Sequence, residues 1–346
     1  MRSAVDWLES LSPWPADGFG TERIRALLHE LGEPQRRYPS IHVVGTKGKS
    51  TATRTIAELL RAEGLKVGGY TSPHVSGWHE RLDTDPATLV RALERVRPHA
   101  EGATQFEVLT AAALAEFAAQ AVDAAVVEAG LGGRLDATNT IDARVVHLTN
   151  VGLEHTDVLG STREAIAAEK LAVAGPDAIV VLGEPEWEPL VPQNEVRFGG
   201  AREATEAFLG RPVQHEVDVQ LPGRFERRGN ELWDGAHTPS AASWLVGQLE
   251  RDDYVLCVSI LDDKDAEGIL ERLRGAGGVL VATESSNSRS LAAKELAARA
   301  EPYFEHVESI ADPVAALGRA RELAGTAGAV LVTGSLYLLA DLSAGG

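Results

Sequence analysis

Short apolar runs alternate with longer mixed runs along the first part of the chain. The short runs predict strands at residues 41–44, 65–70, 123–128, 144–148 and 178–182. The longer runs predict helices at residues 50–63, 106–119 and 162–172. Strands that alternate with helices in this way are typical of an α/β fold whose sheet is mostly parallel.

The pattern weakens between residues 183 and 220, where three prolines interrupt it and only residues 201–209 predict a helix. Leu221, Pro222 and Gly223 form a predicted turn, which is the candidate hinge. The alternation then resumes, with strands predicted at 254–259, 279–282 and 329–333 and helices at 266–274, 291–300 and 313–324. We therefore expect two α/β domains, at residues 1–222 and 223–346, of which the second is smaller.

The composition narrows the class of protein. The 346 residues carry a net charge of −18, whereas nucleic-acid binders usually have a basic surplus, so we expect no nucleic-acid partner. The one cysteine, Cys257, lies in an apolar run and excludes an intramolecular disulfide framework. The N-terminus lacks the apolar region of a signal peptide, and no stretch reaches the roughly 20 apolar residues of a membrane span. We expect a cytoplasmic protein without membrane contact.

A glycine-rich segment separates the strand at 41–44 from the helix at 50–63. It consists of Gly45, Thr46, Lys47, Gly48, Lys49, Ser50 and Thr51. Glycines let backbone N–H groups face an anion, and the helix N-terminus adds partial positive charge. Lys49 can reach the β- and γ-phosphates of a nucleotide, and Ser50 or Thr51 can offer a hydroxyl to phosphate or Mg²⁺. The full phosphate-loop pattern has glycine where this chain has Val43, so this is a shortened form. The alternative is a glycine-rich turn that binds nothing.

Polar residues also follow three other predicted strands. Ser72 follows the strand at 65–70, Glu128 ends the strand at 123–128, and His155 follows the strand at 144–148. Ligands of open parallel sheets bind at the carboxyl ends of strands, so these side chains are candidates to converge beside the glycine-rich segment. A carboxylate, a hydroxyl and an imidazole can complete the coordination of a Mg²⁺ that also holds ATP phosphates. Taken singly, each residue would be interpreted as a surface or capping residue.

Ten motifs in order give the chain its resemblance to a known family. They lie at residues 45–51, 71–74, 106–111, 128–139, 152–156, 169–170, 221–224, 234–237, 263–265 and 333–337. The most specific runs from Glu128 to Asn139. Together they resemble folylpolyglutamate synthase and dihydrofolate synthase, members of the Mur ligase superfamily.

The resemblance implies a P-loop ATP-binding domain followed by a smaller Rossmann-like domain, with the active site in the cleft between them. It implies that a carboxylate of a pteroate or folate substrate attacks the γ-phosphate of ATP. The amine of L-glutamate then attacks the acyl phosphate, which gives an amide, ADP and phosphate. Catalysis of this kind depends on positioning and on charge neutralisation by lysine and Mg²⁺. The resemblance also leads us to expect a monomer.

The resemblance assigns roles to individual residues. Lys49 matches the phosphate-binding lysine, and Ser72, Glu128 and His155 match the first metal site. Lys170 matches a lysine that the family carbamylates to hold a second Mg²⁺; without the resemblance it would be interpreted as an exposed helix lysine.

Further matches concern the nucleotide and the pterin. Arg224, Asp234 and His237 match residues near the nucleotide. Phe106, Thr110, Arg134 and Asp136 lie where the family places its pterin substrate. Without the resemblance, these four would be interpreted as a core aromatic with polar helix and loop residues.

Two alternatives to a folate ligase stay open. One is another amino-acid ligase of the Mur superfamily with a different carboxylate substrate. The other is a divergent protein that binds nucleotide or folate without ligating, because residues 183–220 are fewer than the family usually has there.

Overall fold

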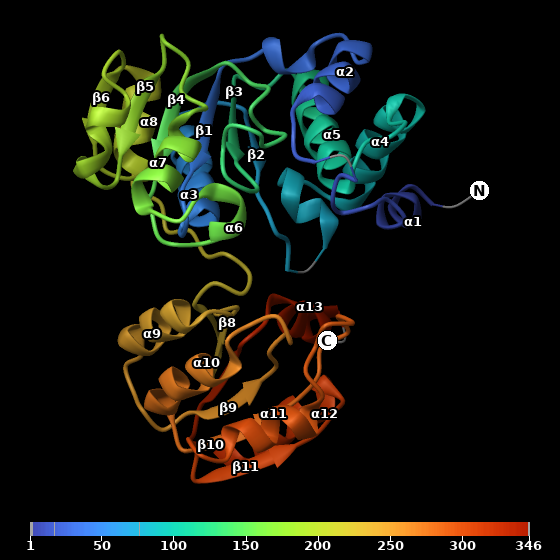
Figure 1. The fold of residues 1–346 in the computed structure, drawn as a ribbon, viewed down its shortest axis with the longest axis vertical. Coiled ribbons are helices and arrows are strands. Elements are labelled where there is room, and N and C mark those ends of the chain that lie inside the picture. The colour runs from blue at the N-terminus through green and yellow to red at the C-terminus, as the bar shows by residue number, and fades with distance from the viewer. Residues whose placement is uncertain (1–2, 17, 76, 345–346) are drawn as a thin grey trace. The chain divides into compact units, whose positions relative to one another are not determined.

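The computed structural model describes residues 3–16, 18–75 and 77–344. The chain forms two compact units, one of Met1–His74 with Trp78–Val219 and one of Val75–Gly77 with Gln220–Gly346. The main boundary thus falls after Val219, three residues before the predicted one after Pro222. Each unit is built around its own sheet (Figure 1).

The first unit contains a six-stranded sheet in the order β2-β3-β1-β4-β5-β6. All neighbouring strands are parallel. The strands are β1 (Ser40–Val44), β2 (Val67–Tyr70), β3 (Ala124–Glu128), β4 (Ala143–Leu148), β5 (Ile179–Leu182) and β6 (Glu195–Phe198). β1 is buried along its whole length between β3 and β4, which fits its near-continuous apolar sequence.

Helices cover both faces of this sheet. Successive residues of β1 point to opposite faces, so Val43 packs with the apolar side chains of α3 (Lys49–Ala62) and α8 (Ala201–Leu209). Val44 packs with those of α7 (Arg163–Leu171). A third cluster joins α5 (Gln105–Gln120) to α1 (Ala4–Glu9), α2 (Glu22–Glu30) and α4 (Pro86–Val96). The short α6 (Thr156–Leu159) precedes α7.

The segment after α8 is fastened to the end of α3. Glu63, whose side chain is 2% exposed, accepts hydrogen bonds from His215 Nδ1 at 2.8 Å and from the backbone N–H of Gln214 at 2.7 Å. It also pairs with Arg211. The His215 and Arg211 hydrogen bonds lower the pKa of Glu63 to about 2. This carboxylate therefore anchors the chain shortly before the first unit ends.

The second unit contains a six-stranded sheet in the order β11-β10-β9-β12-β8-β7. Its strands are β7 (Glu226–Arg228), β8 (Glu231–Asp234), β9 (Val255–Val258), β10 (Val279–Ala282), β11 (His306–Ser309) and β12 (Val330–Thr333). All pairs are parallel except β7 with β8. The helices are α9 (Pro239–Gln248), α10 (Ala266–Leu273), α11 (Ala293–Ala300), α12 (Pro313–Ala324) and α13 (Leu336–Ala344). Cys257, in the apolar run noted in the sequence, is buried in β9.

Several elements were not predicted. They are α1, α2, α4, α6, α9, α13, β6, β7, β8 and β11. β6 and β11 are edge strands whose residues are partly exposed, so they lack the apolar run that marks a central strand. The α/β class itself is confirmed, with one all-parallel and one mostly parallel sheet.

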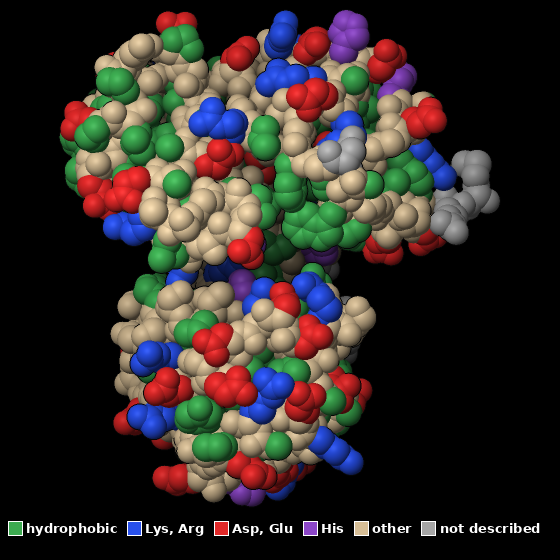
Figure 2. Space-filling model, in the orientation of Figure 1, with side chains coloured by type: hydrophobic (Ala, Val, Ile, Leu, Met, Phe, Trp, Pro, Cys, Tyr) green, Lys and Arg blue, Asp and Glu red, His purple; other side chains and the backbone are tan. Residues whose placement is uncertain are grey.

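Among the described residues, no helix combines the length and the apolar character needed to span a membrane. On the face drawn in Figure 2, acidic and basic side chains are interspersed over each unit.

Candidate functional site

The glycine-rich segment forms a tight turn between β1 and α3. Gly45 has φ +147°, and a Cβ there would lie 3.3 Å from the backbone nitrogen of Asn150 and 3.2 Å from Cβ of Thr149. Gly48 has φ +76° and is the N-cap residue of α3, whose first residue is Lys49. Both positions therefore favour glycine: Gly45 because a side chain would not fit there, and Gly48 because its backbone is in the left-handed conformation. The first backbone N–H groups of α3 are available to an anion at this turn.

The end of β4 holds this turn in place. The backbone N–H of Lys47 donates to Oδ1 of Asn150 at 3.0 Å, and Nδ2 of Asn150 donates back to the Lys47 carbonyl at 3.0 Å. Thr149 Oγ1 donates to the same carbonyl at 2.7 Å, and the N–H of Gly152 donates to Thr46 Oγ1 at 2.9 Å. Sequence analysis missed Asn150. Asn150 lies two residues after the end of β4, a position that does not distinguish it from other polar residues that follow a strand.

Two lysines meet at one carbonyl of the turn. Lys49 Nζ donates to the Gly45 oxygen at 3.0 Å, and Lys170 Nζ donates to the same oxygen at 2.8 Å. Lys170 lies on α7, is 1% exposed, and also pairs with Glu154 at 3.1 Å. Burial lowers the pKa of Lys170, and Glu154 acts in the opposite direction. The structure therefore brings two lysine side chains to the glycine-rich turn, and it buries Lys170, which the local sequence alone would place in solvent.

Glu128 lies against the same turn. Its side chain is almost completely buried, and its two oxygens accept hydrogen bonds from Ser50 Oγ and from the backbone N–H of Ser72, each at 3.0 Å. His155 is exposed and precedes α6 in a left-handed conformation with φ +47°. Of the three predicted metal ligands, Glu128 and Ser72 are thus in direct contact. No three His, Cys, Asp or Glu side chains within residues 3–16, 18–75 and 77–344 are grouped to hold a metal ion.

The loop after β3 is closed by Asp136. Its Oδ2 accepts from the N–H of Leu131 at 2.8 Å, and its Oδ1 accepts from the N–H of Thr138 at 3.0 Å and from the Thr138 hydroxyl. Asp136 is 6% exposed, and burial raises its pKa, although these hydrogen bonds oppose the shift. The predicted substrate residue therefore uses both carboxylate oxygens within its own loop.

The same loop packs directly on α7. A Cβ at Gly133 would lie 2.6 Å from the carbonyl oxygen of Lys170 and 2.7 Å from that of Glu169. The next residue, Arg134, donates its backbone N–H to the Glu169 carbonyl at 3.1 Å and its Nε to the Glu169 carboxylate at 3.1 Å. Arg134 is exposed, and its guanidinium is held in place by the Glu169 carboxylate.

Phe106 and Thr110 lie one turn apart on α5. Phe106 is partly exposed and lies against Gly130, where a Cβ would come within 2.5 Å of Cζ of its ring. Thr110 is fully buried; its hydroxyl donates to the Phe106 carbonyl at 2.9 Å and lies 3.0 Å from the Tyr70 hydroxyl. Phe106 therefore lies beside the loop after β3, while the Thr110 hydroxyl is engaged inside the unit.

The predicted residues of the second unit gather at the carboxyl end of β8. Asp234 ends this strand and accepts from the N–H groups of Phe225 at 2.8 Å and Ala236 at 2.9 Å. Burial raises the pKa of Asp234, whereas the Phe225 hydrogen bond and the positive charge of Arg224 lower it. His237 lies three residues after the end of this strand and is exposed.

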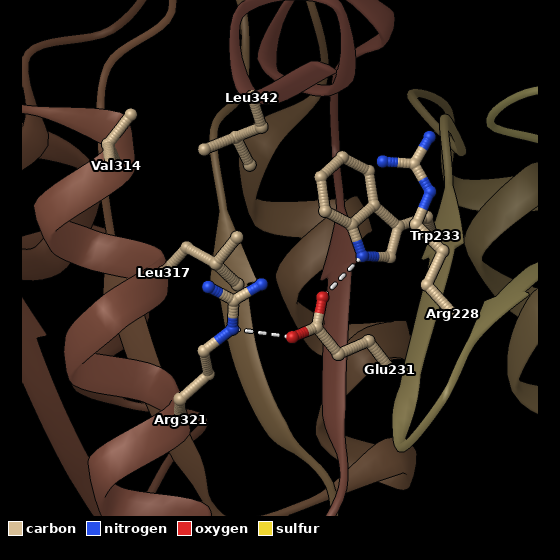
Figure 3. Close-up of a pocket in the computed structure, with 7 residues that line it drawn as sticks. All are labelled: Arg228, Glu231, Trp233, Val314, Leu317, Arg321 and Leu342. Atoms are coloured by element: carbon tan, nitrogen blue, oxygen red, sulfur yellow. Dashed lines mark hydrogen bonds and ion pairs between the residues drawn. The ribbon is translucent and has the colours of Figure 1, made fainter. Parts of the chain in front are cut away.

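A pocket of about 260 Å³ lies elsewhere in the second unit (Figure 3). Its lining residues are Arg228, Glu231, Trp233, Val314, Leu317, Arg321 and Leu342. Glu231 accepts from Trp233 Nε1 at 2.8 Å and from Arg321, and the Arg228 guanidinium stacks 3.9 Å from the Trp233 ring centroid. Because residues alternate along a strand, Glu231 and Trp233 lie on the opposite face of β8 from Asp234. The pocket contains none of the predicted site residues.

The chain matches two family models. Residues 43–181 match the "Mur ligase middle domain" and residues 223–336 match the "Mur ligase, glutamate ligase domain". The sequence is similar to the dihydrofolate synthase/folylpolyglutamate synthase of Mycobacterium tuberculosis, with 31% identity over 82% of this chain and 77% of the relative.

Solved structures of the same group share the fold. Escherichia coli FolC, solved in complex with DHPP and ADP, superposes with a TM-score of 0.83 at 27% identity, covering 99% of this chain and 97% of that one. The bifunctional folylpolyglutamate synthase/dihydrofolate synthase of Yersinia pestis, complexed with AMPPNP and Mn ion, superposes with a TM-score of 0.83 at 26% identity. That match covers 100% of this chain and 98% of the other.

Proposed function

The chain belongs to the folylpolyglutamate synthase and dihydrofolate synthase family of Mur ligases, and from this premise we propose how its residues divide the work. It is an ATP-dependent ligase that forms a C–N bond between glutamate and a pteroate or folate carboxylate. Both predictions made from the ten motifs, the family and the reaction class, are confirmed by these matches.

The main support for this proposal is the set of side chains that contact residues 45–51. Within the loop of residues 45–51, Lys49 donates to the Gly45 carbonyl. From outside the loop, Lys170 donates to the same carbonyl and Glu128 accepts from Ser50. The Lys49 cation and the Glu128 carboxylate beside a turn of backbone N–H groups suit a polyanion that is accompanied by a divalent cation. This arrangement supports binding of the ATP phosphates at residues 45–51.

The reaction then proceeds in two displacements. A substrate carboxylate oxygen attacks the γ-phosphorus of ATP, the bond to the β-phosphate oxygen breaks, and ADP leaves. The amine of L-glutamate attacks the acyl carbon and loses a proton, and phosphate departs as the amide forms. Lys49 neutralises charge that develops on the transferring phosphoryl group, which is how phosphoryl transfer is mainly accelerated. The positions of the loop after β3 and of Phe106 support their contact with the acid substrate.

The family uses ATP together with a divalent metal, and we propose that Glu128 holds Mg²⁺ here. The residues fit: a buried carboxylate beside the Ser50 hydroxyl offers the hard oxygen donors that Mg²⁺ prefers, while water and phosphate supply its other ligands. Bound there, the ion would neutralise phosphate charge. We assign Ser72 and His155 to the same metal site as a proposal that rests on the resemblance alone.

Carbamylation of Lys170 is the finer part of this proposal. An ammonium repels a cation, whereas its carbamate offers an anionic oxygen for a second Mg²⁺. The reaction joins CO₂ to the neutral amine with release of a proton. Burial of Lys170 favours the neutral amine, which supports the proposal; the pairing with Glu154 favours the ammonium. In the second unit we propose that Arg224, Asp234 and His237 contact the nucleotide.

ADP release tests the function directly. The protein is incubated with ATP, Mg²⁺ and L-glutamate, with dihydropteroate, tetrahydrofolate or no acid, and products are identified by mass. We expect ADP release that requires both the acid and glutamate, with a product larger by one glutamyl group. Release that ignores the pteroate compounds but follows another carboxylate would favour a different Mur-type ligase. Nucleotide binding without turnover on any acid would favour a non-ligating relative.

A further inference from the structure

A line of three buried side chains connects β1 to the loop after β3. His42 Nε2 lies 2.8 Å from Thr138 Oγ1, and the Thr138 hydroxyl contacts Oδ1 of Asp136. His42 and Thr138 are fully buried, and Asp136 is 6% exposed. His42 lies in the centre of the sheet, three residues before Gly45. Central parallel strands are normally apolar, and burying a polar side chain costs free energy unless it is hydrogen-bonded. A histidine here therefore indicates a hydrogen bond that offsets this cost.

The donors and acceptors in this line can be assigned. Asp136 accepts from two backbone N–H groups, of Leu131 and Thr138, and these keep its carboxylate in the acceptor role. The single hydroxyl proton of Thr138 therefore points to Asp136, and the Thr138 oxygen accepts from Nε2–H of His42. This tautomer leaves Nδ1 of His42 without a proton, and Nδ1 has no hydrogen-bond partner among the described residues. Burial lowers the pKa of His42 to about 3, so the ring is neutral at physiological pH.

We propose that His42 and Thr138 are positioning residues for the acid substrate. They hold Asp136, and through it the loop of residues 130–139, at a fixed distance from the phosphate loop. β1 and β3 are neighbouring strands, and the two loops that leave them carry the ATP site and the proposed acid site. Asp136 thus acts by shaping its loop, because its oxygens accept from that loop's own donors. This inference rests on the proposed function, since it assigns the loop to the acid substrate.

Variants of Thr138 separate positioning from general stability. Thr138→Val keeps the side-chain shape but removes the hydroxyl, whereas Thr138→Ser keeps the hydroxyl. The matched control is Thr53→Val, because Thr53 is also fully buried in the first unit and its hydroxyl has no hydrogen-bond partner among the described residues. For Thr138→Val we expect a KM for tetrahydrofolate or dihydropteroate raised about tenfold, and a kcat/KM lowered about 10- to 100-fold. The affinity for Mg-ADP, measured by calorimetry, stays within about threefold.

Thr138→Ser and Thr53→Val should stay near wild type in all these constants. Kinetic constants of Thr138→Val equal to those of Thr53→Val would overturn the inference. An equal loss of ADP affinity and acid affinity would also overturn it, since that outcome reports general damage.

The tautomer of His42 gives a test that needs no measurement of activity. ¹⁵N NMR of the wild-type protein, with the His42 signals assigned from His42→Gln, should show the proton on Nε2 and no titration between about pH 5 and 8. A proton on Nδ1, or titration in this range, would refute the hydrogen-bond line. A wild-type protein that shows the expected tautomer but ligates no pteroate compound would instead reject the proposed function.

Discussion

Replacing Gly133 by alanine tests whether the loop after β3 is set by its contact with α7. The new Cβ would lie 2.6 Å from the Lys170 carbonyl oxygen and 2.9 Å from the Lys170 Cα, where ordinary contact begins at 3.4 Å. Both neighbours are backbone atoms, so no side chain can turn away. The loop and α7 must therefore separate by about 0.8 Å, which close-packed interiors resist.

Two contributions lower the free energy of unfolding of Gly133→Ala. Forcing a methyl group into a packed interface costs about 1–3 kcal/mol. A shift of this size also stretches the 3.1 Å hydrogen bond from the Arg134 N–H to the Glu169 carbonyl beyond its working range, which adds about 1 kcal/mol. We expect the free energy of unfolding to fall by about 2–4 kcal/mol in total, which lowers the melting temperature by about 4–16 °C for a unit of this size. Misplacement approaching 1 Å near reacting groups lowers kcat/KM by about 100-fold.

Gly175→Ala is the matched control. Gly175 lies shortly after α7 in the same unit, and a Cβ there would meet no atom within 4 Å. Neither glycine has a left-handed φ, so both substitutions are tests of space alone. Thermal unfolding and glutamate-dependent ADP release are measured on both variants. If Gly133→Ala matches Gly175→Ala in both measurements, the loop does not depend on its contact with α7, and the reasoning fails.

Four further predictions concern charge. Lys49→Ala should lower ADP release by orders of magnitude without lowering the melting temperature appreciably, because it removes charge from the transferring phosphoryl group; comparable ADP release from mutant and wild type would remove Lys49 from the site. Glu128→Gln should raise the Mg²⁺ concentration needed for half-maximal activity at least tenfold, because an amide is a neutral, poorer ligand, whereas Glu116→Gln, at another buried carboxylate of the first unit, should leave the Mg²⁺ titration unchanged. Lys170→Ala should be nearly inactive and partly restored by acetate or propionate; an active variant would argue against the carbamate. The folded pKa of Glu63, about 2, lies below its ordinary value of 4.5, so its stabilising contribution is present above that value and is lost as the pH falls toward 2. Glu63→Gln should therefore melt below wild type at pH 7 and converge with it in acid, and a pH-independent difference would exclude this linkage.

The glycine-rich turn between β1 and α3 could be predicted from the sequence because its determinants are local. Gly45 and Gly48 are close in sequence, and the strand before them and the helix after them follow from apolar spacing within a few residues. The central strands were equally accessible, since each is a short apolar run that needs no distant partner to be recognised. Edge strands such as β6 were missed because their exposed residues carry less apolar signal.

The site around that loop was decided by the tertiary structure. Lys170 lies 125 residues after Gly45, and only the packing of α7 on the sheet buries its ammonium beneath the loop. Asn150 holds the loop from 103 residues away, and no local pattern distinguished it from an ordinary polar residue after a strand.

Asp136 shows the same limit most clearly. The resemblance marked it as a substrate residue, and the fold turns its carboxylate toward the backbone of its own loop and toward Thr138, with His42 behind. Local sequence determines where strands, helices and tight turns form, because those depend on neighbouring residues. Which polar groups are buried together, and which atoms remain free for a substrate, depends on contacts across the sheet, and these exist only after the chain has folded.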